Sequence, residues 1–144
     1  MFYKLLPELE EMKGLRDGNS VWYLIGEIFG ANVQDLSYGL SDPDFRAFDF
    51  YEGFPGQGHY VNAAASHPYK RLFKAVPEVF VGPFDPDLVG AYTPGDSLLM
   101  GAHHIREGVV IRPMQEREDN KLGRVILKSV SEDYLLRKGG TELE

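Results

Sequence analysis

The sequence predicts an α+β fold, in which an antiparallel or mixed sheet is flanked by short helices. Two observations support this class. Apolar segments of strand length alternate with short segments whose apolar residues recur at helical spacing, and turn-forming glycine and proline residues separate them. A length of 144 residues fits one domain spanning residues 1–144, with enough chain to bury a substantial core.

In the first half of the chain, Leu5, Leu6, Leu9 and Met12 recur at helical spacing and predict a helix over residues 4–13. Asp17-Gly18-Asn19 then forms a turn. Three strands are expected next, at residues 21–29, 45–51 and 59–62. The last two are joined by a hairpin connection or longer loop at residues 52–58, where Pro55 lies among three glycines.

In the second half, Pro68 is expected near the first turn of a helix over residues 68–75. A strand over residues 78–84, a short helix starting at Asp85 and a break at residues 93–96 follow. Residues 108–112 and 124–130 are expected to pair as antiparallel strands, connected by the polar stretch 114–123. A terminal helix over residues 132–137 should end at Gly139-Gly140.

The composition restricts the classes of function. There is no cysteine, so the chain has neither disulfides nor thiolate metal ligands, and we expect a cytoplasmic protein. No apolar run has the length of a membrane span, and the N-terminus does not read as a signal peptide. The formal charge of −7 argues against a generic nucleic-acid binder, which is usually basic. A nucleic-acid role therefore requires a local site, and basic residues do exceed acidic ones between Arg117 and Lys138.

The most informative residues are a carboxylate and a lysine on neighbouring apolar strands. Glu107 opens the segment Glu107-Gly108-Val109-Val110-Ile111, and Lys128 lies inside Arg124-Val125-Ile126-Leu127-Lys128. Burying a lysine without a partner is costly. The pair indicates a site that holds an anion and a cation together, such as a nucleoside phosphate with its metal. A structural ion pair at a strand end is an equally good interpretation of these two strands alone.

Two residues in the first half could contact a nucleoside. Glu27 lies between Gly26 and Gly30 in an apolar strand, where it could hydrogen-bond a ribose hydroxyl, support a metal from the second sphere, or form a salt bridge within the sheet. Phe48 could stack on a purine, or it could belong to the core with Phe50. His103-His104 near Glu107 lacks a third ligand at the spacing of a zinc site.

Taken in order, four segments resemble the motifs of the covalent nucleotidyltransferases, specifically the RNA ligase branch and its Deinococcus-type nick-sealing members. Residues 24–30 (LIGEIFG) with 33–39 resemble motif III, and residues 45–50 (FRAFDF) resemble motif IIIa. Residues 107–113 (EGVVIRP) resemble motif IV, and residues 127–131 (LKSVS), followed by 134–138 (YLLRK), resemble motif V.

This resemblance implies part of a nucleotidyltransferase (ATP-grasp-like ligase) domain and an ATP-dependent RNA ligase. In that reaction a lysine attacks the α-phosphate of ATP, AMP passes to an RNA 5′-phosphate, and the RNA 3′-hydroxyl displaces AMP. By resemblance Glu27 would contact the nucleoside sugar and Phe48 would stack on adenine. Glu107 would serve a step that depends on Mg or Mn, and Lys128 would hold the α-phosphate.

The chain departs from the family pattern at the nucleophile. Motif I reads Lys-x-(Asp/Glu/Asn)-Gly and should lie tens of residues before motif III. Lys13 to Gly18 has two extra residues before the glycine and lies too close to Glu27. Motif V also often carries Lys-x-Lys, whereas Ile126 and Val130 flank Lys128 here.

We therefore expect a partial ligase domain that starts after motif I and works with an N-terminal fragment carrying the lysine. The alternatives are a non-catalytic domain that binds nucleotide, RNA or a partner chain, and an interaction domain that keeps only the fold.

Overall fold

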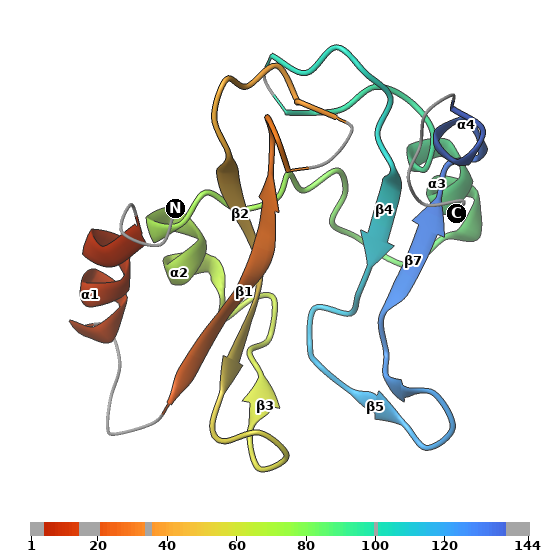
Figure 1. Ribbon diagram of the computed structural model, residues 1–144. Helices are drawn as coiled ribbons and strands as arrows, with labels where there is room; N and C mark the ends of the chain where they lie inside the picture. Colours follow the sequence, from red (N-terminus) through yellow and green to blue (C-terminus); the bar gives the residue numbers. More distant parts are fainter. Residues whose placement is uncertain (1–4, 15–20, 34–35, 100, 138–144) are drawn as a thin grey trace. The chain divides into compact units, whose positions relative to one another are not determined.

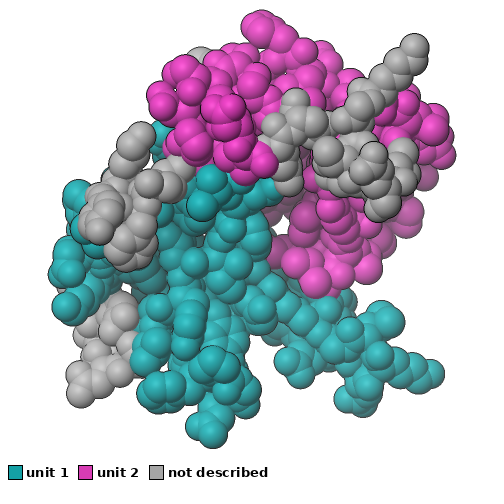
Figure 2. All heavy atoms as spheres, in the orientation of Figure 1, with its two compact units in different colours: residues 1–28, 45–76, 113–125 teal, residues 29–44, 77–112, 126–144 magenta. Residues whose placement is uncertain are grey.

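A computed structural model describes residues 5–14, 21–33, 36–99 and 101–137 of the chain. The predicted turn at Asp17-Gly18-Asn19 and the predicted helix end at Gly139-Gly140 lie outside these residues. The chain divides into two compact units. Unit 1 comprises residues 1–28, 45–76 and 113–125, and unit 2 comprises residues 29–44, 77–112 and 126–144 (Figure 2). Short helices and small sheets occur together, so the α+β prediction is confirmed.

Unit 1 is built on a three-stranded sheet with the strand order β1-β2-β3 (Figure 1). Its strands are β1 (Trp22–Phe29), β2 (Asp44–Glu52) and β3 (His59–Tyr60), and β2 and β3 are antiparallel with Tyr51 opposite Tyr60. Helices α1 (Leu6–Gly14) and α2 (His67–Leu72) lie on one side of this sheet. These elements confirm the helices and strands that the sequence predicts for the first half of the chain.

The core of unit 1 lies between that sheet and the two helices. Met12 of α1 packs in one cluster with Ala47 and Phe50 of β2, Val61 and Phe73. Every second residue of a strand faces the same side. Accordingly, Trp22 and Leu24 of β1 pack against this cluster, whereas Tyr23 between them is exposed.

A small antiparallel hairpin completes unit 1. Strands β5 (Glu118–Asp119) and β6 (Gly123–Arg124) pair within the stretch that the sequence indicates only as a polar connection. Arg124 therefore belongs to β6, and the prediction of one strand over residues 124–130 was wrong in its first half. The turn of this hairpin is closed by the Asp119 carboxylate, which accepts the backbone N–H groups of Lys121 and Leu122.

Unit 2 contains a two-stranded ribbon, β4 (Gly108–Ile111) paired antiparallel with β7 (Leu127–Val130). Helices α3 (Pro86–Tyr92) and α4 (Glu132–Leu135) confirm two further predictions. Asp85 caps α3 by accepting the N–H of Asp87 at 2.9 Å, and Pro86 occupies the first turn, where its missing N–H costs nothing.

The strand predicted over residues 78–84 does not form. Pro77 and Pro83 cannot donate to a ladder, and Phe80, Val81 and Phe84 are exposed instead of facing a sheet. The apolar run is therefore an extended surface segment. Within the described residues, no helix has the length and apolar character that crossing a membrane requires.

Candidate functional site

The β4–β7 ribbon brings Glu107 and Lys128 together, as the sequence predicts. Lys128 pairs across the ribbon with Val110, and its Nζ forms an ion pair with Oε1 of Glu107, the residue just before β4. The Lys128 side chain is 58% exposed and that of Glu107 is 32% exposed. The expectation of a buried lysine was therefore wrong, because only one face of the two-stranded ribbon is covered.

The covered face is fixed by hydroxyl groups. Ser129, next to Lys128 and so on the opposite face, lies 2.7 Å from the Thr93 hydroxyl, and Thr93 in turn donates to the carbonyl of Val89 in α3 at 2.7 Å. Thr93 is buried. Since a lone pair of strands is marginally stable in water, these contacts to α3 hold the ribbon in place and leave its Lys128 face open.

Backbone contacts fix the position of Glu107. The N–H of Ser131 donates to the Glu107 carbonyl at 2.7 Å, directly after β7 and at the start of α4. Gly108 is also required, because a Cβ at this position would meet the backbone oxygen of Ser129. Motif-IV-like and motif-V-like segments are thus locked together by backbone geometry, and their two charged side chains meet at one end of the ribbon.

Glu27 and Phe48 both lie in unit 1, on β1 and β2. Glu27 is exposed and not buried in its strand, so the salt bridge that burial would demand is unnecessary. Phe48 is 40% exposed, whereas its neighbours Asp49 and Phe50 are buried. The core interpretation therefore holds for Phe50 and fails for Phe48, whose ring is available to a ligand.

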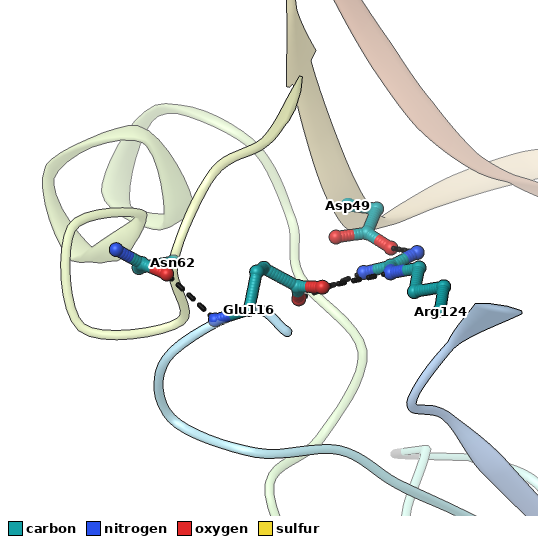
Figure 3. A network of polar contacts seen from close by, with 4 residues as sticks. All are labelled: Asp49, Asn62, Glu116 and Arg124. Atoms are coloured by element: carbon teal, nitrogen blue, oxygen red, sulfur yellow. Dashed lines mark hydrogen bonds and ion pairs between the residues drawn. The ribbon is translucent and has the colours of Figure 1, made fainter. Parts of the chain in front are cut away.

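The strongest polar network in unit 1 centres on Arg124, which the sequence analysis counts only as one of several basic residues (Figure 3). Its guanidinium forms two hydrogen bonds with the Glu116 carboxylate, at 2.8 and 2.9 Å, and an ion pair with Asp49 at 2.7 Å. The backbone N–H of Glu116 donates to the side-chain oxygen of Asn62 at 2.7 Å. The network joins β2, the segment after β3 and the β5–β6 hairpin.

Electrostatics keep Arg124 fully charged. Burial opposes the charged form, but the hydrogen bonds to Glu116 and Asp49 outweigh it and raise the pKa of Arg124 above its ordinary value. One signal in the sequence could have revealed the network. Asp49 lies between two phenylalanines in a strand, and a buried carboxylate there requires a cationic partner.

Unit 2 also contains a hollow of about 280 Å³. It is lined by residues of two loops, Leu36, Ser37, Gly39, Gly101, His103 and His104. The four predicted site residues do not line it. The ring of His104 packs edge-on against Tyr38, and its Nδ1 lies 2.7 Å from the carbonyl of Ile105. Among the described residues, no group of three or more His, Asp or Glu side chains could hold a metal ion, which agrees with the absence of a zinc spacing in the sequence.

An α+β chain with an ordered set of strand-borne charged residues and an exposed Lys-Glu pair fits a nucleotidyltransferase-like class of protein. Comparison with family models gives the family. The model for RNA ligase matches residues 2–130, so the chain belongs to the RNA ligase family. A search of curated proteins found no significant match.

Proposed function

We propose that this chain forms part of the catalytic domain of an ATP-dependent RNA ligase, which joins RNA strands through enzyme-AMP and RNA-adenylate intermediates. Membership of the RNA ligase family supports RNA as the substrate class. The single observation that carries the catalytic part of the proposal is the Glu107–Lys128 ion pair on the open face of the ribbon.

Lys128 has the properties that phosphate binding needs. Its ammonium is more than half exposed, and its strand is held from the other face by Ser129 and Thr93. A cation already in place costs no reorganisation when negative charge develops on a transferring phosphate, which is the main source of electrostatic catalysis. We propose that Lys128 turns from Glu107 to the α-phosphate when nucleotide binds.

Glu107 suits a divalent metal that is held mainly by substrate. Mg²⁺ is typically bound by one or two carboxylates together with substrate phosphates and water. Glu107 supplies one such carboxylate and would hold the ion there. The metal, when bound, would neutralise phosphate charge and assist the displacement of the leaving group. Until then, Lys128 satisfies the carboxylate.

For the nucleoside we propose Phe48 and Glu27. The exposed Phe48 ring can stack on adenine, and base stacking on an aromatic side chain is worth about 1–3 kcal/mol. Its backbone is fixed because both following residues are buried, Phe50 in the core and Asp49 against Arg124. The exposed Glu27 carboxylate can accept a hydrogen bond from a ribose hydroxyl.

The attacking lysine would come from a segment outside these 144 residues. The test is to supply a motif-I-bearing fragment of a related ligase and to measure sealing of a nicked RNA duplex with ATP and Mg²⁺ or Mn²⁺. Sealing should appear with the wild type and disappear with Glu107→Ala or Lys128→Ala. Arg117→Ala, an exposed residue of unit 1, should seal normally.

A non-catalytic domain that binds nucleotide or RNA is the second candidate, favoured by the lack of a motif I context around Lys13. It predicts RNA or ATP binding without sealing, even when the two fragments associate. That outcome, or normal sealing by Glu107→Ala, would contradict the ligase proposal.

A further inference from the structure

Three tyrosines form a row across the sheet of unit 1, on the face away from the core. Tyr23 of β1, Tyr51 of β2 and Tyr60 of β3 follow one another, with ring centroids 5.9 Å apart for the first pair and 5.1 Å for the second. Tyr51 and Tyr60 are direct partners in the strand register. We call these three residues the tyrosine row.

The core does not use these rings. Trp22 and Phe50, the strand neighbours of Tyr23 and Tyr51, point to the opposite face and pack on Tyr69 of α2, with ring centroids 5.0 and 5.4 Å away. Tyr23 is 39% exposed. A sheet with one face packed on helices and one open face normally carries polar residues on the open one. Three aromatic rings there require a different explanation.

A cation extends the row at its β3 end. The Arg124 guanidinium lies 3.5 Å from the centroid of the Tyr60 ring and is fixed in that position by Asp49 and Glu116. Aromatic rings and arginine planes are the two kinds of surface on which unstacked RNA bases lie. The row therefore presents three rings and one guanidinium in a fixed order across three strands.

Two hairpin tips of the same unit add to this surface. Both tips point to the bottom of the view in Figure 1. Phe54, in the connection between β2 and β3, is 63% exposed, and the Tyr51 hydroxyl shapes this connection by accepting the N–H of Gly58 and donating to the carbonyl of Phe54. The β5–β6 hairpin carries the exposed cations Arg117 and Lys121, which could meet backbone phosphates.

We propose that the tyrosine row binds a single-stranded segment of the RNA substrate by stacking of its bases, with Tyr23 as the most accessible ring. The inference rests on the proposed RNA ligase function, which supplies RNA as the partner, and it adds where and how the strand is held. Because every base has a π-face, such a surface tolerates many sequences, as a strand-joining enzyme requires.

The test uses the full chain and a fluorescently labelled single-stranded RNA, with binding measured by anisotropy. Tyr23→Leu should weaken binding roughly tenfold, since it keeps an apolar side chain and loses the ring. Tyr23→Phe should bind like the wild type. Phe84→Leu is the matched control, because Phe84 is an equally exposed aromatic residue that lies outside the row.

An abasic strand separates stacking from any general effect on the fold. On that strand, Tyr23→Leu and the wild type should bind equally weakly, because no base remains to stack. Equal losses on both strands, or a Tyr23→Leu variant that binds like Phe84→Leu, would overturn the inference and leave the ligase proposal intact. A wild type that fails to bind any RNA would contradict the proposed function as well.

Photo-crosslinking covers the case in which Tyr23→Leu does not fold. Wild-type chain irradiated with RNA that contains 4-thiouridine should give adducts on Tyr23, Tyr60 or Phe54, identified by mass spectrometry. Adducts confined to other residues would overturn the inference.

Discussion

Replacing Arg124 with alanine should destabilise the protein strongly. The Arg124 side chain is 18% exposed, and it neutralises Asp49 and Glu116, whose side chains are 4% and 12% exposed. Removal of one partner of a buried ion pair leaves an uncompensated charge and costs about 3–5 kcal/mol. The variant also loses the stack on Tyr60. Since domains are stable by only about 5–15 kcal/mol, this loss should be evident in urea unfolding followed by the fluorescence of Trp22, the single tryptophan.

A double-mutant cycle tests the reasoning behind this magnitude. If the cost comes from stranding the Asp49 carboxylate, Asp49→Asn should recover part of the stability of Arg124→Ala, because it removes the buried charge. Arg124→Lys should lie between the wild type and Arg124→Ala, since an ammonium cannot form the two-pronged contact with Glu116. Arg117→Ala is the exposed control and should change stability by no more than about 0.5 kcal/mol. An Arg124→Ala variant as stable as this control would refute the reasoning.

Three further predictions concern local features. Gly108→Ala should destabilise by about 1–3 kcal/mol, because its Cβ meets the Ser129 backbone, whereas Gly90→Ala in α3 has open space and should be neutral or stabilising; the two unfolding midpoints decide it. Thr93→Val should cost about 1–2 kcal/mol of unfolding free energy and Thr93→Ser less; equal losses would contradict a hydroxyl role. The N–H groups of Lys121 and Leu122 lower the pKa of Asp119 below 3.8, so its contribution to stability should be lost only as the pH falls below that value; a higher midpoint in an NMR titration would contradict the hairpin geometry.

The order of elements could be predicted because local patterns determine it. Leu9 and Met12 at helical spacing, the turn around Pro55 and the apolar segment 108–111 each specify one element with little help from distant residues. The segment 78–84 shows the limit of this approach. Its apolar residues resemble a strand, but forming one depends on a neighbouring strand that the fold does not supply, and Pro77 and Pro83 prevent pairing.

The candidate site was predictable to the extent that charge demands a partner. Glu107 and Lys128 meet as expected because two adjacent apolar strands each carry one charge. Arg124 was missed as a site residue because its partners Asp49 and Glu116 are distant in sequence or lie in a polar stretch without a pattern. The tyrosine row was missed for a similar reason, since its members become neighbours only through strand pairing.

Sealing of a pre-adenylated RNA nick tests the central claim most directly. In this step the RNA 3′-hydroxyl attacks the 5′-phosphate, a phosphodiester forms and AMP leaves, so no lysine nucleophile is needed. The assay would combine this chain with a motif-I-bearing fragment whose lysine is replaced by alanine, and would follow ligated RNA and released AMP. We predict sealing by the wild type and a loss of at least about a hundredfold in Glu107→Ala and Lys128→Ala. No sealing by the associated fragments, or full activity of Glu107→Ala, would contradict the assignment of this ribbon as part of a ligase active site.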